Sequence, residues 1–243
     1  MRLQALIICT AALLSPSIID GRRLGENEEQ NQQEENCPPA RFKTKEDISL
    51  EEYTSRKWYV HEQAETTYLP KSRNYCVTAE YKLLDKPTPF FGYTIEVTNT
   101  AQDKERKSTY GGTIYAAETN ENDPSKLEVA PGFLPRFLAG PYWIVDYDET
   151  EGYALVIGGS PQVRNKETGK CRTNNRWITS SGGLWIFTRE SVRNDALIEK
   201  VKGIAADLGL DTSVLNTVDH DNCQYDEADA EDITEIAFQR NSS

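Results

Sequence analysis

The sequence predicts an all-β domain followed by one C-terminal helix. Between residues 57 and 188, short runs rich in β-branched and aromatic residues alternate with turn-rich stretches such as 85–89 and 120–124. Eight such runs at roughly regular spacing indicate either a sandwich or a closed barrel. The runs are Trp58–His61, Tyr75–Leu84, Tyr93–Asn99, Thr113–Ala116, Leu127–Val129, Tyr142–Tyr147, Tyr153–Ile157 and Leu184–Thr188.

The hydrophobic period changes after Arg189. Apolar residues then recur at intervals of three and four, which is typical of one face of an amphipathic helix. These residues are Val192, Ala196, Leu197, Val201, Ile204, Ala205 and Leu208. Gly209 marks the expected end of the helix. We expect this helix to cover the wall formed by the strands and to protect it.

The first 21 residues have the form of a secretory signal peptide. Arg2 provides a positive start, residues 3–14 are mostly apolar, and small residues follow. A buried N-terminal helix is the alternative. The stretch is too short to cross a bilayer, and no other stretch of the sequence is long and apolar enough to do so. We therefore expect a chain that is secreted, or that enters the endomembrane lumen, after removal of residues 1–21.

Acidic residues are concentrated in two segments that flank the predicted domain. The formal charge of the chain is −12, with five Glu in residues 22–36 and six acidic residues against one Arg in residues 224–243. Neither segment has much apolar surface to bury, so we expect both to be disordered. Outside residues 1–36 and 224–243 the chain has 27 acidic and 23 basic residues. This near balance offers no basic surface for nucleic acid.

The cysteines predict disulfide bonds. Of the five in the sequence, Cys9 leaves with the signal peptide, and four remain. Four cysteines allow three pairings. Their spacing contains no CxxC, so the sequence favours disulfide bonds over metal ligation or redox chemistry. The four are Cys37, Cys76, Cys171 and Cys223.

Three motifs follow one another along the chain. They are Tyr53-Thr-Ser-Arg-Lys-Trp58-Tyr59, then Pro141-Tyr-Trp-Ile-Val-Asp-Tyr-Asp148 with Tyr153-Ala-Leu-Val156, then Leu184-Trp-Ile-Phe-Thr-Arg189. Together with the helix and Cys223, the ordered set resembles the lipocalin family, and within it apolipoprotein D and its bacterial and plant relatives. The resemblance covers residues 36–223 and extends to Arg73-Asn-Tyr-Cys76. Arg56 stands where the family has a glycine.

The resemblance implies a lipocalin domain over residues 37–223. This domain would be a closed, eight-stranded, antiparallel up-and-down β-barrel with the helix packed on its wall. Such a barrel is just wide enough for side chains or one ligand. Trp58 and Arg189 resemble the family's barrel closure, in which the guanidinium lies over the indole. The implied disulfides, each joining a terminal arm to the barrel, are Cys37–Cys171 and Cys76–Cys223.

The predicted ligand site is the barrel interior. Alternate strand residues face the same side, so Trp185 and Phe187 share the face of Arg189, and Val60 shares the face of Trp58. The resemblance adds Tyr81 and Tyr142. An aromatic pocket with a few hydroxyls suits an apolar molecule with one polar end, which makes fatty acids, sterols, retinoids and carotenoids the expected ligand classes. In a solid β domain the same residues would be ordinary core.

Two loops are unusual in composition. Residues 131–138 contain Phe133, Leu134, Phe137 and Leu138, and family topology places them at the open mouth of the barrel. They would contact a membrane or lipoprotein surface while ligand is exchanged, or fold into the mouth as a lid. Residues 160–181 contain five basic residues against Glu167 alone. This loop would attract a carboxylate at the mouth, or be a solvated loop held by Cys171.

The sequence predicts a monomeric binding protein without cofactor or metal, rather than an enzyme. Only His61 and His220 are present, and neither lies in a catalytic pattern. His61 should face outward, since it lies three residues after Trp58, and His220 should lie in a solvated turn. Two alternatives remain open. One is an enzyme resembling the xanthophyll de-epoxidases, although their cysteine-dense and glutamate-rich flanking segments are absent here. The other is a ligand-free scaffold for protein contacts, which a polar, filled interior would favour.

Overall fold

The structure is a computed structural model that describes residues 36–120, 122–174 and 182–225. The predicted signal peptide and nearly all of both acidic flanks lie outside the described residues. Residues 37–223, for which we predicted one domain, fall within them apart from the two gaps. None of the helices in the described ranges has the length and the apolar character needed to cross a bilayer.

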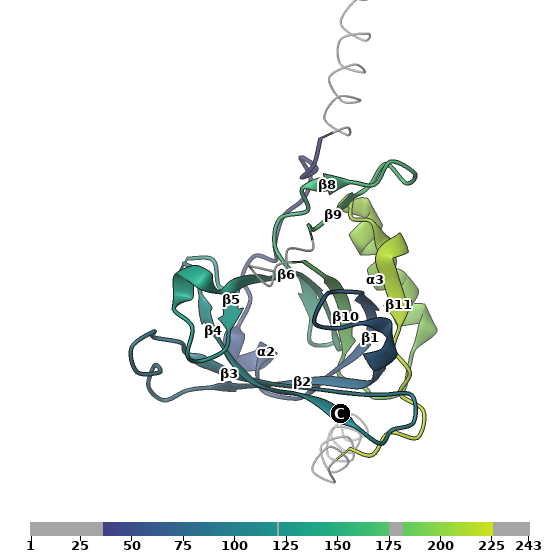
Figure 1. Ribbon diagram of the computed structural model, residues 1–243. Coiled ribbons are helices and arrows are strands. Elements are labelled where there is room, and N and C mark those ends of the chain that lie inside the picture. Colours follow the sequence, from purple (N-terminus) through teal and green to yellow (C-terminus); the bar gives the residue numbers. More distant parts are fainter. Residues whose placement is uncertain (1–35, 121, 175–181, 226–243) are drawn as a thin grey trace, which may run out of the picture. The chain divides into compact units, whose positions relative to one another are not determined.

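The domain is a closed antiparallel barrel of eight strands, as predicted (Figure 1). Each strand pairs with the next along the chain, and β10 returns to pair with β1, which closes the sheet. A short ninth strand, β11, pairs with the last residues of β1. The barrel strands are β1 (Trp58–Ala64), β2 (Tyr75–Leu83), β3 (Ile95–Gln102), β4 (Thr109–Glu118), β5 (Lys126–Ala130), β6 (Gly140–Asp148), β7 (Tyr153–Ile157) and β10 (Leu184–Thr188), and β11 is Leu215–Thr217.

Several strands are longer than the sequence predicted, and β4 differs most. It starts four residues before the predicted Thr113 and includes Gly111 and Gly112. Both glycines pair with β3, and a Cβ at Gly111 would lie only 2.0 Å from the carbonyl oxygen of Asn99. The close approach of the β3 and β4 backbones therefore requires glycine at position 111. Both glycines lie within β4.

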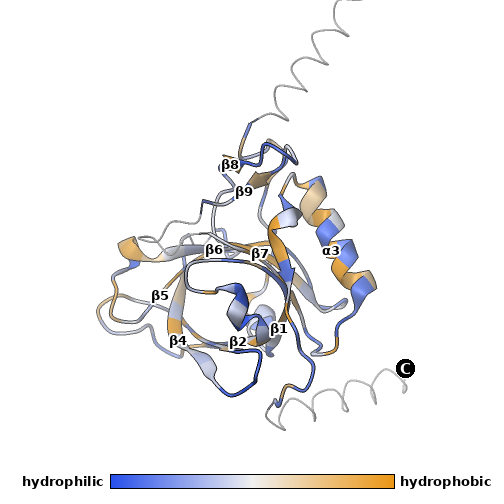
Figure 2. Cartoon of the chain, turned by 45° about the vertical axis from the view of Figure 1, so that its right-hand side comes forward, coloured by the Kyte–Doolittle hydropathy of each residue, from blue (hydrophilic) through white to orange (hydrophobic). Residues whose placement is uncertain are grey.

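The helix α3 (Asp195–Asp207) packs on the outer face of β7 and β10, as predicted (Figure 2). Asn194 caps its first turn by accepting a hydrogen bond from the amide of Leu197 at 3.2 Å. Val192 was wrongly predicted as the first residue of the apolar helix face. Because the helix begins only after Asn194, Val192 lies outside it and is 79 % exposed. Ile198, Val201 and Ala205 are its buried residues.

Two disulfides attach the chain's arms to the barrel. Cys37–Cys171 joins the N-terminal arm to β9 (Cys171–Arg172), which forms a small hairpin with β8 (Val163–Arg164). Cys76–Cys223 joins β2 to the C-terminal arm. Both are the pairings that the family resemblance implied.

The C-terminal arm fills a gap between β1 and β2. A bulge between Val60 and Glu62 turns β1, so that only Trp58 and Tyr59 pair with β2 while residues 62–64 pair with β11. Beyond β11, the amide of Val218 donates to the carbonyl of His61 at 3.0 Å. The arm thus continues the sheet where β1 and β2 separate.

The two histidines meet under this arm. His61 faces outward from the barrel as predicted, but it is fully buried, because His220 covers it with a ring centroid distance of 4.7 Å. His61 Nε2 donates to the carbonyl of Glu190 at 2.9 Å, and His220 Nε2 donates to that of Val60 at 2.8 Å. His220 is therefore half-buried and bonded to β1, not part of a solvated turn. Burial lowers the pKa of His220 to about 4 and also lowers that of His61.

One end of the barrel is closed by Trp58 and Arg189. The short helix α2 (Leu50–Tyr53) crosses this end, and the indole of Trp58 donates to the carbonyl of Tyr53 at 3.0 Å. The Arg189 guanidinium carbon lies 3.5 Å from the centre of the Trp58 ring. A contact of this kind contributes about 0.5–2 kcal/mol.

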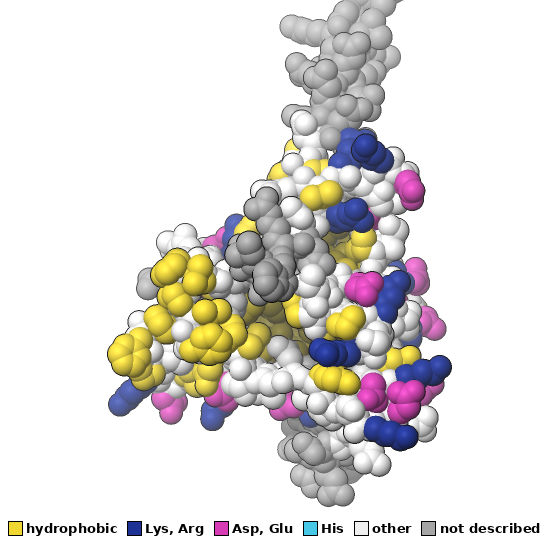
Figure 3. Space-filling view, in the orientation of Figure 1, with side chains coloured by type: hydrophobic (Ala, Val, Ile, Leu, Met, Phe, Trp, Pro, Cys, Tyr) yellow, Lys and Arg dark blue, Asp and Glu magenta, His cyan; other side chains and the backbone are white. Residues whose placement is uncertain are grey.

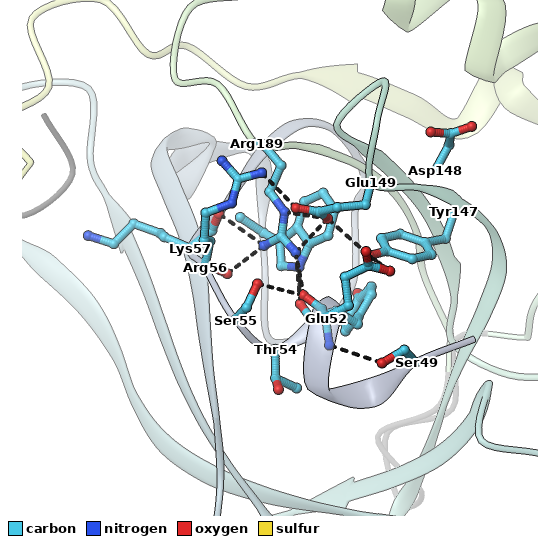
Figure 4. Close-up of polar contacts among 12 residues, drawn as sticks. Ser49, Glu52, Thr54, Ser55, Arg56, Lys57, Tyr147, Asp148, Glu149 and Arg189 are labelled. Carbon is cyan, nitrogen blue, oxygen red and sulfur yellow. Dashed lines mark hydrogen bonds and ion pairs between the residues drawn. The ribbon is translucent and has the colours of Figure 1, made fainter. Parts of the chain in front are cut away.

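Arg189 also bonds to the segment 52–57 and to the β6–β7 turn (Figure 4). Its guanidinium donates to the carbonyls of Glu52, Tyr53 and Arg56, and to the carboxylate of Glu149 at 2.8 and 3.0 Å. Arg56 donates to the same carboxylate at 2.6 Å. Burial alone would raise the pKa of Glu149, but the bonds from the two arginines outweigh it and hold that pKa below its usual value.

Replacing Arg189 by methionine should lower the free energy of unfolding by about 3–5 kcal/mol, since Glu149 and several carbonyls lose their partner. Urea titration followed by tryptophan fluorescence measures this loss. The control is Lys200→Met, which breaks an exposed ion pair with Glu151. That variant should lose less than about 1 kcal/mol. Equal losses in the two variants would contradict the role given to Arg189.

The depressed pKa of His220 predicts a loss of stability in mild acid. Between about pH 6.5 and pH 4, the unfolded chain binds a proton at this histidine that the folded chain does not. The free energy of unfolding should therefore fall by about 3 kcal/mol as the pH decreases through this window. Denaturant titrations at each pH measure the slope. In His220→Gln the slope should be smaller, and an unchanged slope would refute the assignment.

Candidate functional site

The barrel encloses a cavity of about 480 Å³ above the Trp58 closure. This volume lies in the range typical of small-molecule sites. In Figure 3 it is the hollow at the centre of the face, with hydrophobic side chains inside it. All five residues predicted to bind ligand line it, namely Val60, Tyr81, Tyr142, Trp185 and Phe187.

Strand alternation brings these residues together. Val60 of β1 pairs with Phe187 of β10, and Trp185 follows two residues away on the same inward face. Val77 and Tyr81 point inward from β2 in the same way. Inward residues from neighbouring strands therefore form an apolar wall, because the closed sheet turns one face of every strand toward the axis.

Three tyrosine hydroxyls meet at the lower part of the cavity. The hydroxyl of Tyr142 lies 2.6 Å from that of Tyr53 and 2.7 Å from that of Tyr81. Burial raises the pKa of Tyr81 to about 12, and burial raises those of Tyr53 and Tyr142 well above their usual value. All three are therefore neutral hydroxyls that donate and accept hydrogen bonds.

Tyr53 was not among the predicted site residues. It is fully buried below Tyr81, and its ring lies 5.3 Å from that of Trp58. It comes from α2, outside the strands, so strand alternation has no means of placing it. Its position at the start of the first lipocalin-like motif was the available signal.

A single charged side chain, Arg73, lines the cavity among the described residues. It ends the 3₁₀ helix η1 (Lys71–Arg73) in the β1–β2 loop, and its guanidinium carbon lies 4.1 Å from the centre of the Tyr110 ring. Tyr110 comes from the first residues of β4, so the pair lies at the opposite end of β4 from the β4–β5 turn. Sequence reasoning missed Arg73 because nothing in the local pattern distinguishes it from other surface arginines.

The loop 131–138 exposes apolar side chains, as predicted. Phe133 is 78 % exposed and Phe137 84 %. Leu134 is half-buried instead and packs beside Tyr93, whose hydroxyl donates to the carbonyl of Leu134 at 2.9 Å. This bond places the loop against the β2–β3 connection, where Phe90 is 99 % exposed.

These two loops carry an apolar patch beside the cavity (Figure 3). We define the aromatic patch as Phe90, Phe133, Phe137 and Leu138. Pro131, at the start of the second loop, also lines the cavity. The loop packs on the outer wall, so its exposed side chains do not fold into the mouth as a lid. The contribution of Phe90 was not predicted, because a single phenylalanine between turns gives no periodic signal.

The basic loop 160–181 is described only to residue 174. Its described part forms the β8–β9 hairpin and packs on the end of α3, where Lys170 donates to the carbonyl of Ala206 at 3.0 Å. None of its described residues lines the barrel cavity. Arg176, one of the five basic residues, lies outside the described residues.

Comparisons with known proteins found similar solved structures but no match by sequence. No protein-family model matches the chain, and no curated protein matches its sequence. Solved structures do match it, including apocrustacyanin C1 (16 % identity, 86 % of this chain and 90 % of that chain, TM-score 0.47). Others are the cockroach major allergen Per a 4 (18 %, 76 % and 95 %, 0.49) and lobster apocrustacyanin A1 (15 %, 83 % and 86 %, 0.45).

The architecture itself identifies the fold class. Eight antiparallel strands follow one another around a closed barrel, one helix packs outside, and a tryptophan with an arginine closes one end. This is the up-and-down barrel of the lipocalin type.

Proposed function

We propose that this protein binds one small, mainly apolar molecule in its barrel and carries it. The observation that supports this most directly is the 480 Å³ cavity, whose lining is apolar except for a few hydroxyls, amides and Arg73. A filled, polar interior would have favoured a scaffold for protein contacts. The barrel instead contains a cavity with a mainly apolar lining. The ligand classes that fit are fatty acids, sterols, retinoids and carotenoids.

Binding without catalysis is part of this proposal. The two histidines of the chain lie on the outer side of the barrel, away from the cavity. Within the described ranges, no three side chains of His, Cys, Asp or Glu are grouped to hold a metal ion. The test is product analysis after incubation with an epoxy-xanthophyll, and an altered product would contradict the proposal.

We further propose that the protein is secreted, or lies in the endomembrane lumen, and that it is related to the apolipoprotein D-like lipocalins. The two disulfides support an oxidising compartment. The likeness to apolipoprotein D rests on the three sequence motifs.

The aromatic patch supports a second contact, with a membrane or lipoprotein surface. Large exposed apolar side chains on neighbouring loops are unusual on a soluble monomer unless they meet another apolar surface. The patch adjoins the cavity through Pro131, which lines it. A ligand would then pass between the lipid and the barrel with little exposure to water.

Replacing Trp185 by alanine should weaken binding of each of the proposed ligand classes about tenfold, because a large apolar contact is lost. Titration with retinol and with a fluorescent fatty acid measures the affinity. The matched control is Trp143→Ala, since Trp143 packs on Phe42 outside the barrel. Unaltered affinity in the Trp185 variant would remove the cavity as the binding site.

Replacing Phe133 and Phe137 together by serine should reduce partitioning onto neutral phospholipid vesicles at least tenfold. The reason is that about 1.5–3 kcal/mol of apolar burial is lost at each side chain. Vesicle flotation measures the bound fraction. Val192→Ser, which removes an equally exposed apolar group before α3, is the control. Unchanged partitioning of the double variant would refute the membrane contact.

A further inference from the structure

We propose that Arg73 binds the carboxylate of an anionic amphiphile, whose apolar chain fills the cavity below it. This inference rests on the proposed function and narrows its ligand to a long apolar molecule with one terminal carboxylate. It starts from the position of one cation at the edge of an otherwise uncharged, mainly apolar cavity.

Arg73 is held in place but retains its donors. Its guanidinium lies over the ring of Tyr110 at 4.1 Å, which fixes the plane of the group. In the described part of the chain, no carboxylate pairs with it and no side-chain hydrogen bond engages it. The N–H groups at the edge of a stacked guanidinium point away from the ring, and two of them match the two oxygens of a carboxylate.

The other end of the cavity does not suit a carboxylate. Its polar groups are the neutral hydroxyls of Tyr81 and Tyr142, which bond to each other at 2.7 Å. Arg189 lies beyond the Trp58 ring, and its guanidinium is engaged by carbonyls and by Glu149. A charge placed at this end would lose its hydration without gaining a cation, which is costly. The geometry therefore points the carboxylate toward Arg73 and the apolar chain toward the tyrosines.

Apolar side chains from neighbouring strands line the cavity between the two ends. Val77 of β2, Val97 of β3 and Ile114 of β4 line it. Along β2, the four steps from Val77 to Tyr81 span about 13 Å at the rise of an extended strand. This length accommodates an extended hydrocarbon chain with its polar group at Arg73.

The test compares cis-parinaric acid with its methyl ester, which share one hydrocarbon chain and differ in charge. At low ionic strength the unaltered protein should bind the acid about tenfold more tightly than the ester. Raising the salt concentration should reduce that preference, because the group lies at the solvent-exposed mouth. Fluorescence titration of each probe gives both affinities.

Arg73→Gln should weaken binding of the acid about tenfold and so abolish the preference, and Arg73→Lys should keep most of it. Lys71→Gln removes the same charge from the same 3₁₀ helix, but Lys71 does not line the cavity. That variant should bind like the unaltered protein. Ester binding in every variant also shows that the barrel is folded.

Two results would overturn the inference, and they differ in what they say of the proposed function. If acid and ester bind equally well, or if Arg73→Gln keeps the preference, the carboxylate assignment is wrong while binding in the cavity stands. If neither probe binds the unaltered protein, both the assignment and the proposed function for long-chain ligands fail.

Discussion

The pairing of β10 with β1 is the constraint on which the rest of the structure depends. It turns an eight-stranded sheet into a barrel and leaves no free edge between the first and last strands. It also gives β10 two buried faces. Trp185 and Phe187 point into the cavity, whereas Leu184 and Ile186 pack under α3. The ligand site and the helix contact are therefore two sides of one strand.

Closure also gives the two arginines at the ends of the barrel different surroundings. At the closed end, Arg189 is surrounded by carbonyls, Glu149 and the Trp58 ring, so its charge is satisfied within the protein. At the open end, Arg73 rests on an aromatic ring, and no carboxylate of the described residues pairs with it. Similar residues thus have different chemical roles. The first stabilises the barrel, and the second is able to meet a charged ligand.

The terminal arms complete the wall where the strands alone do not. β1 leaves β2 after its bulge, and β11 with residues 218–220 takes the vacant place. The Cys76–Cys223 bond retains this arm beside the barrel. The same arm explains the acid sensitivity expected of the fold. It buries His61 and His220, and burial lowers the pKa of both histidines.

Much of the fold and part of the site could be predicted from the sequence. Local patterns located the eight strands and the helix, and alternation with family resemblance identified Val60, Tyr81, Tyr142, Trp185 and Phe187 as cavity residues. Strand alternation repeats every two residues and the helix face every three to four, so both patterns can be recognised in the sequence alone. Disulfide pairing came from resemblance alone, since four cysteines allow three pairings.

Other features were decided only by the tertiary structure. The burial of His61 depends on an arm about 160 residues away in the chain. The tyrosine cluster joins a helix, β2 and β6, and Arg73 gains its position from Tyr110 on another strand. None of these has a local period, because each arises where segments distant in sequence meet. The sequence by itself determined which face of each strand is apolar, and barrel closure decided which polar groups that face would meet.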